Sequence, residues 1–167
     1  MTISNSLEEF IDILHLDPGS PEAEWEIVNT LLPPMQGEAV SALEWVFFQH
    51  QGYIDTRARA GLKLLEQSSE RSWSILEQLV VSDKPDDRDT ALAVLSTLRS
   101  ERAIGLAACL LDDPYPYVRL EAAEFLGPYL PDKVKSVLLD LLEHQEDWVQ
   151  QKATSLLTAA GTDVHGR

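Results

Sequence analysis

Apolar residues recur every three to four positions along most of the chain, which is the spacing of one face of an α-helix. In residues 100–113 one such stripe contains Ile104, Ala107, Ala108 and Leu111. In residues 117–130 a second stripe contains Val118, Ala122, Phe125, Leu126 and Tyr129. Pro114 lies between the stripes and Pro116 stands where the second begins, where a missing amide N–H costs little. The pattern predicts two antiparallel helices joined by a tight turn.

This two-helix pattern recurs at a fixed interval, the one that separates Arg57 from Arg88 and Arg88 from Arg119. Four positions of the second helix show this correspondence in four copies. In chain order the copies read Thr56, Arg57, Ala60 and Leu64; Asp87, Arg88, Ala91 and Leu95; Val118, Arg119, Ala122 and Leu126; and Val149, Gln150, Ala153 and Leu157. The tripeptide Ser-Glu-Arg occurs at residues 69–71 and again, one interval later, at residues 100–102. A fixed period of this size, roughly 31 residues, indicates a repeat array.

The N-terminal third follows the period less closely. Ser6 and Glu9 form a capping box that opens one helix, and Ser20 with Pro21 opens a second helix that ends at Pro33. We therefore expect a single domain over residues 1–167, in which residues 1–36 form a degenerate acidic cap, residues 37–160 form four repeats and residues 161–167 form a polar tail.

The motif Asp113-Pro114, Val118-Arg119, Ala122-Ala123 and Leu126-Gly127 resembles the signature of HEAT repeats, especially the short bacterial HEAT-like type. The resemblance covers roughly residues 38–160. The repeats in this range are similar to the phycobilisome-lyase-type HEAT-like units. Its period is shorter than the roughly 40–47 residues of longer HEAT and armadillo units. The resemblance implies an all-α, right-handed α-solenoid of about five antiparallel helical pairs.

In such families an aspartate before the second helix and an arginine at its start support neighbouring repeats. The resemblance therefore implies an internal polar ladder formed by Arg57, Arg88 and Arg119 with Asp113. A basic side chain beside turn carbonyls and carboxylates would also hold a helical pair together on physical grounds alone. The alternative is that these arginines bind a ligand. Gln150 replaces the arginine in the last copy, as expected near a terminal cap.

Little catalytic chemistry can be assembled from the sequence. The histidines show no i, i+4 zinc spacing, and we interpret all four as surface residues: His15, His50, His144 and His165. Cys109 lies in an apolar segment that predicts an inert core thiol. No glycine-rich loop that could cradle a phosphate is present. We therefore expect a non-enzyme with no cofactor and no metal.

The charge is strongly acidic, with a formal net charge of −15 at pH 7. This opposes a general affinity for nucleic acids or anionic membranes, whose partners need clustered Lys and Arg. Residues 1–56 contain ten acidic residues and no Lys or Arg, so they hold ten of the fifteen net charges. A basic partner would explain this asymmetry, and a solubilising cap is the alternative. The single cysteine, with no signal peptide and no apolar span, predicts a cytoplasmic protein.

Two positions flank the ladder arginine in each second helix. Two residues before it stand Glu24, Asp55, Asp86, Tyr117 and Trp148, and two residues after it, in the fourth pair, stands Glu121. If the helices stack in register, these six residues form a partner-binding surface with an acidic end and an aromatic end. The alternative is that each side chain packs against its neighbouring turn. The other tryptophans lie on apolar stripes and are expected in the core: Trp25, Trp45 and Trp73.

These features favour a non-catalytic protein-binding module, monomeric or in a heterocomplex, that captures a basic protein partner. A bacterial immunity or inhibitor protein that neutralises a cationic toxin is one specific form. The alternatives are an adaptor or assembly factor and, from the resemblance, a phycobilisome-lyase-like HEAT protein that acts on tetrapyrrole chromophores.

Overall fold

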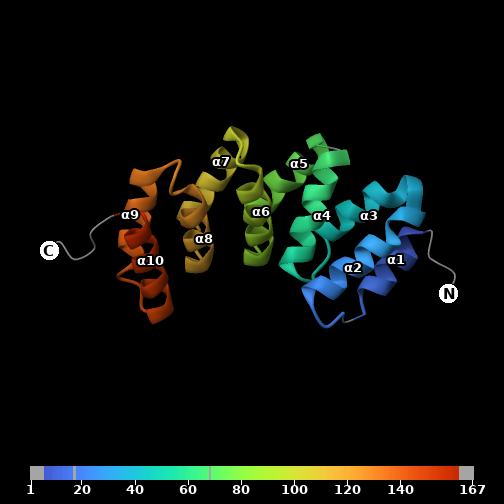
Figure 1. Cartoon of the computed structure of the whole chain (residues 1–167), viewed down its shortest axis with the longest axis horizontal. Coiled ribbons are helices and arrows are strands. Elements are labelled where there is room, and N and C mark those ends of the chain that lie inside the picture. Colours follow the sequence, from blue (N-terminus) through green and yellow to red (C-terminus); the bar gives the residue numbers. More distant parts are fainter. Residues whose placement is uncertain (1–5, 17, 68, 162–167) are drawn as a thin grey trace. The chain divides into compact units, whose positions relative to one another are not determined.

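A computed structural model of the chain describes residues 6–16, 18–67 and 69–161, which form helices and turns without any β-strand. The all-α class expected from the sequence is confirmed. The elements follow one another as α1 (Leu7–Leu14), α2 (Pro21–Leu31), η1 (Pro33–Glu38), α3 (Ala39–Phe48), α4 (Ile54–Gln67), α5 (Ser69–Val80), α6 (Pro85–Leu98), α7 (Glu101–Ala107), η2 (Ala108–Asp112), α8 (Pro116–Leu126), α9 (Pro131–Leu141) and α10 (Asp147–Ala159), as Figure 1 shows.

The helices begin where the sequence places proline or a hydroxyl cap. Proline occupies the first turn of α2, α6, α8 and α9, where its missing N–H has no intrahelical partner to lose. The Ser6 hydroxyl accepts a hydrogen bond from the Glu9 amide at 3.4 Å, and the Ser20 hydroxyl accepts one from the Ala23 amide at 3.2 Å. Ser100 caps α7 in the same way. The predicted helix starts at Ser6 and Ser20 are therefore confirmed.

The starts of four helices follow the sequence period. α4, α6, α8 and α10 begin at Ile54, Pro85, Pro116 and Asp147, each one period after the last. In each of them the amide at the ladder position donates to the carbonyl four residues earlier, for example Arg57 to Tyr53 and Arg119 to Tyr115. These four helices thus share the same backbone hydrogen bond at their starts.

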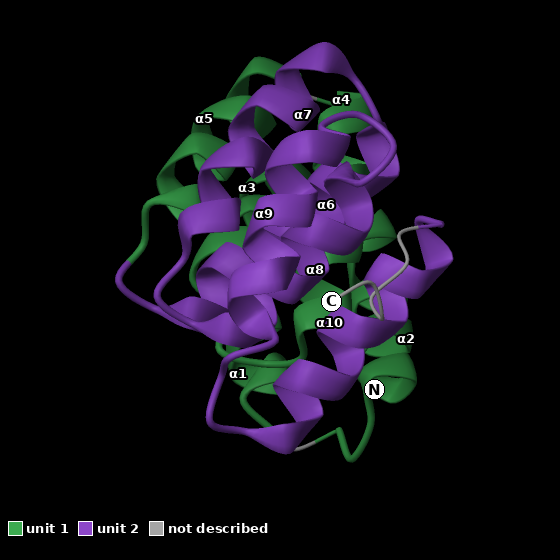
Figure 2. Cartoon of the chain, turned by 90° about the vertical axis from the view of Figure 1, so that its left-hand side faces the viewer, with its two compact units in different colours: residues 1–82 green, residues 83–167 purple. Residues whose placement is uncertain are grey.

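The chain divides into two compact units, Met1–Ser82 and Asp83–Arg167, coloured separately in Figure 2. The division falls between α5 and α6, and each unit has its own apolar core. Unit 1 buries Phe10, Leu43, Phe47, Leu64, Leu76 and Leu79, and unit 2 buries Leu95, Leu111, Leu120, Leu126, Leu138 and Leu141. The single domain predicted over residues 1–167 stays a prediction.

Two expectations about buried residues are wrong. Cys109 is exposed, because residues 108–112 form the tighter 3₁₀ turn η2. With about 3.0 instead of 3.6 residues per turn, the side chains no longer follow the apolar stripe of α7. The tryptophans expected in the core are half-buried: Trp25, Trp45 and Trp73.

In unit 1, α3 and α4 approach each other closely at a glycine. A Cβ atom added at Gly61 of α4 would lie 2.7 Å from a ring carbon of Phe47 on α3, and Phe47 is fully buried. The absence of a side chain at Gly61 therefore sets how closely these two helices pack.

We expect Gly61→Ala to destabilise the protein by about 1–3 kcal/mol, because the new methyl group overpacks a ring that has no room to move. Gly105→Ala is the matched control, since Gly105 is an exposed helical glycine with no atom within 4 Å of the added Cβ. That change should stabilise α7 by about 0.5–1 kcal/mol. Urea unfolding followed by circular dichroism measures both, and a change of the same sign in the two variants would contradict the packing assigned to Gly61.

Candidate functional site

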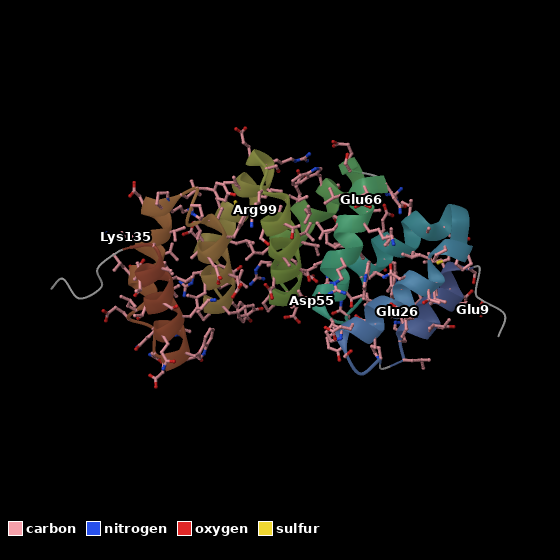
Figure 3. All side chains as sticks on the ribbon, in the orientation of Figure 1. Glu9, Glu26, Asp55, Glu66, Arg99 and Lys135 are labelled. Carbon is pink, nitrogen blue, oxygen red and sulfur yellow. The ribbon has the colours of Figure 1, made fainter. Side chains whose placement is uncertain are left out.

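The six residues predicted to bind a partner are distributed over both units. Glu24 and Asp55 belong to unit 1, whereas Asp86, Tyr117, Glu121 and Trp148 belong to unit 2. Asp55 is exposed in the first turn of α4, where Figure 3 labels it. In unit 2 the helices that carry the predicted residues pack in series, α6 against α8 and α8 against α10.

Glu24 is not a surface residue, and the prediction that it belongs to an exposed acidic edge is wrong. It is 1% exposed, and its Oε1 lies 2.8 Å from Nε2 of His50, which is itself buried. Its Oε2 accepts a hydrogen bond from the Tyr53 amide at 3.1 Å. The interpretation of His50 as a surface residue is therefore also wrong. The signal in the sequence was the spacing of Glu24, Val28 and Leu31, which share the buried face of α2.

The burial of Glu24 follows from a need that recurs along the chain. The residues before the second helices stand one sequence period apart, and the amides of Tyr53, Tyr115 and Glu146 donate to a side chain. The Tyr115 amide donates to Asp113 Oδ1 at 2.8 Å, and the Glu146 amide donates to His144 Nδ1 at 3.2 Å. Both acceptors lie two residues earlier in the same turn. Before Tyr53 that position holds Gln51, and the carboxylate of Glu24 supplies the acceptor from α2.

The residues of the proposed polar ladder make unequal contacts. Arg57 is buried and donates from Nε and Nη2 to the Phe47 carbonyl, at 3.3 and 3.2 Å. Arg88 is buried and donates through Nε and Nη2 to the two carboxylate oxygens of Asp113, at 2.5 and 2.9 Å. Its guanidinium also lies 5.5 Å from the ring centroid of Tyr115. Arg119 is half-buried, and its Nε has no hydrogen-bond partner among the described residues.

An open cavity of about 710 Å³ lies in unit 2 between α6 and α8, and we call it the α6–α8 groove. One wall carries Asp89, Ala93 and Ser96, spaced by four and three residues along one face of α6. The other carries Glu121, Glu124 and Phe125 along one face of α8. Small side chains on α6 face longer ones on α8, so the two helices leave the space between them partly empty.

The α6–α8 groove has an excess of negative charge. Its charged lining consists of Asp89, Glu121, Glu124 and Arg99, which is three carboxylates and one guanidinium. Arg99, labelled in Figure 3, follows the last residue of α6. Its backbone is in the left-handed region, at φ 48°. Lys152 of α10 contacts Glu124 Oε2 at 2.5 Å, and this hydrogen bond raises the pKa of Lys152. The rings of Phe125 and Tyr129 also line the groove, with centroids 5.8 Å apart.

Tyr117 lies one helical turn before Glu121 on α8 and is half-buried. Burial raises the pKa of Tyr117 to about 12, and the negative charges of Asp89 and Asp86 contribute to the shift. Of the predicted residues, Glu121 lines the groove, Tyr117 lies one turn before it on α8, and Asp86 of α6 is near enough to Tyr117 for its charge to act on that ring. Trp148 is 48% exposed, as expected, and its Nε1 donates to Glu146 Oε2 at 2.7 Å, but it does not line the groove.

The acid-rich first third is partly explained by contacts within unit 1. Glu38 Oε2 accepts the Leu7 amide at 2.7 Å at the start of α1, and Glu44 forms an ion pair with Arg71. Glu8, Glu9 and Glu22 lie in first helical turns, where negative charge complements the helix dipole. The density of carboxylates in residues 1–56 is therefore not by itself a sign of a binding surface.

The described residues also bear on metal binding and on membrane insertion. Within residues 6–16, 18–67 and 69–161, no three His, Cys, Asp or Glu side chains gather closely enough to hold a metal ion. His15 is exposed and His144 is half-buried, while His165 lies outside the described residues. None of the helices in the described part of the chain combines the length and the apolar character needed to cross a bilayer.

No protein-family model matches the chain, and the curated proteins compared with it include no relative.

We expect Asp113→Asn to destabilise the protein by about 3–5 kcal/mol, because it removes the carboxylate charge to which the buried Arg88 guanidinium donates two hydrogen bonds. Asp112→Asn is the control, since Asp112 is exposed and its ion pair with Lys133 spans 3.3 Å at the surface. That change should cost less than about 1 kcal/mol. Thermal and urea unfolding compare the two variants, and similar losses in both would remove the structural role assigned to the Arg88–Asp113 pair.

We expect the pKa of Tyr117 to be about 12. The difference between the ultraviolet titration curves of the wild type and of Tyr117→Phe gives the midpoint for this one tyrosine. Asp89→Asn should lower this midpoint, because it removes a negative charge that opposes the tyrosinate. Since an unfolded tyrosine titrates near 10, the contribution of Tyr117 to stability is complete below about pH 10 and is lost as the pH rises toward 12. A midpoint near 10 in the folded protein would contradict the burial and the nearby charges.

Proposed function

We propose that the chain is a non-catalytic protein-binding module and that the α6–α8 groove captures a Lys- or Arg-rich segment of a basic protein. The observation that carries this proposal is the excess of carboxylates in a groove that also exposes aromatic rings. Carboxylates bind ammonium and guanidinium groups through charge-assisted hydrogen bonds, and aromatic rings attract the same cations. The groove thus offers both kinds of contact within one cavity.

The distribution of charge supports a directional mode of binding. Glu121 is exposed on α8, whereas Arg99 lies at the end of α6 and would repel a cation placed beside it. A basic segment would therefore place its cations toward Glu121 and Asp89. The net charge of −15 would also attract a cationic partner from a distance, which raises the association rate at low salt.

We further propose that the chain is a right-handed α-solenoid of HEAT-like repeats. The starts of α4, α6, α8 and α10 at intervals of one sequence period support this architecture. In such an array the second helices of successive pairs form one continuous face, and the α6–α8 groove would be one segment of it.

The proposed function has two specific forms. In the first, the chain is a cytoplasmic bacterial immunity or inhibitor protein and the partner is a cationic toxin. In the second, it is an adaptor or assembly factor within a larger complex. The identity of a partner captured at low salt separates the two forms, and the kinetic test below decides whether that partner uses the groove.

We expect Glu121→Lys to slow association with an identified basic partner by about tenfold at low salt and by less at high salt. The reason is that salt screens the long-range attraction between the acidic surface and the cationic partner. Asp140→Lys is the matched control, an exposed acid on α9 that does not line the groove. Surface plasmon resonance at two salt concentrations gives both rates. A partner without net positive charge, or equal effects of the two substitutions, would contradict the proposal.

A further inference from the structure

A second cavity, of about 470 Å³, lies entirely within unit 1, and we call it the Trp45 pocket. Its walls come from the end of α1, the last turn of α3 and the connection from α3 to α4. The aromatic and imidazole rings of His15, Trp45, His50 and Tyr53 line it, together with the carboxylate of Glu24. Its volume lies within the range of small-ligand sites, which is about 300–1,000 Å³.

The rings of the pocket are held in place by one another. The Trp45 ring centroid lies 5.7 Å from that of His15 and 5.2 Å from that of His50. His50 is fixed by its contact with Glu24, and Glu24 is fixed by the Tyr53 amide. Trp45 is half-buried and Tyr53 is 38% exposed, so both rings remain accessible to a ligand.

Gly52 keeps the buried carboxylate and imidazole in contact. A Cβ atom at this position would lie 2.1 Å from His50 Nε2 and 2.2 Å from Glu24 Oε1. Only a residue without a side chain can therefore pass over the pair. The backbone at Gly52 is part of the pocket wall, directly against the Glu24 carboxylate.

The charge of the pocket is one-sided. Its described lining contains no Lys or Arg, and residues 1–56 of the sequence contain none. The Glu24 carboxylate contacts His50 Nε2 and the Tyr53 amide, and neither contact comes from a Lys or Arg side chain. Arg57, the first basic residue, donates to the Phe47 carbonyl and does not line the pocket. A cation among aromatic rings is attracted by the ring quadrupoles as well as by the carboxylate.

We propose that the Trp45 pocket binds an organic cation, an alkylammonium or alkylguanidinium group whose apolar stem lies against Trp45 and Tyr53. The site lies in unit 1 and is independent of the α6–α8 groove. The same chemistry is presented by a free small amine and by a Lys or Arg side chain of a protein.

The test uses n-butylguanidinium as the probe and n-butylurea as its uncharged isostere, so the two probes differ in charge and not in shape. The readout is the shift of the Trp45 indole N–H signal in a ¹H–¹⁵N spectrum, assigned by its loss in Trp45→Phe. We expect saturable binding of the cation and at least tenfold weaker binding of the urea. Equal binding of both probes, or binding of neither, would overturn the proposal.

Glu24→Gln keeps the shape and the acceptor for the Tyr53 amide but removes the charge, and we expect it to weaken cation binding about tenfold. Glu26→Gln is the matched control, because Glu26 is an exposed acid on the same helix that does not line the pocket (Figure 3). If Glu24→Gln does not fold, Tyr53→Ala removes an exposed ring and should weaken binding at least threefold. Unchanged affinity in the folded pocket variant would overturn the proposal.

Two further arms identify the source of the cation and separate this site from the proposed function. A Gly-Gly-Arg-Gly-Gly peptide that binds as well as n-butylguanidinium supports a protein side chain as the ligand, whereas binding of the free cation alone supports a small amine. Glu121→Lys should leave probe binding unchanged. If the protein binds the probe but Glu121→Lys does not change the rate of association with the partner, the proposal for the pocket stands and the proposal for the groove is overturned.

Discussion

A turn between two packed helices leaves backbone amides and carbonyls that must find partners away from water, and several polar side chains of this protein supply them. Arg57 reaches the Phe47 carbonyl, and Gln150 reaches the His144 carbonyl at 2.6 Å. Asp113 and Glu24 accept the amides of Tyr115 and Tyr53. An unpaired buried backbone group of this kind costs about 1–3 kcal/mol of stability. These side chains are therefore committed to the fold.

Much of the fold could be predicted because its signals are local. Pro116 and Ser20 mark helix starts through effects that act within one turn, and the spacing of apolar residues identifies the helices. The period of the sequence predicted where four helices begin. By contrast, the helical spacing of residues 100–113 carries no sign of the 3₁₀ turn that exposes Cys109.

The candidate site was predicted only in part. Aligning positions by the period assumes that equivalent residues make the same contacts in every copy. Among the predicted residues, Glu121 lines the α6–α8 groove, and the charge of Asp86 acts on Tyr117. Glu24 belongs to the copy that departs most from the pattern, where Gln51 stands at the position that Asp113 occupies two copies later. The turn therefore draws its acceptor from α2, and the acid expected on the surface becomes internal.

The acidic residues of this protein differ in the groups that they contact. Glu24, Glu38 and Asp113 hold backbone amides, and Glu44 and Glu124 contact basic side chains. A net charge of −15 therefore overstates the negative surface offered to a partner. What distinguishes the α6–α8 groove is that Glu121 is exposed beside accessible rings on a helix that other contacts hold in place. The Trp45 pocket differs again, since its carboxylate is buried, fixed by two hydrogen bonds and placed at the wall of an aromatic cavity. Glu121 and Glu24 thus differ in burial and in hydrogen bonding, and a charge count along the sequence does not distinguish them.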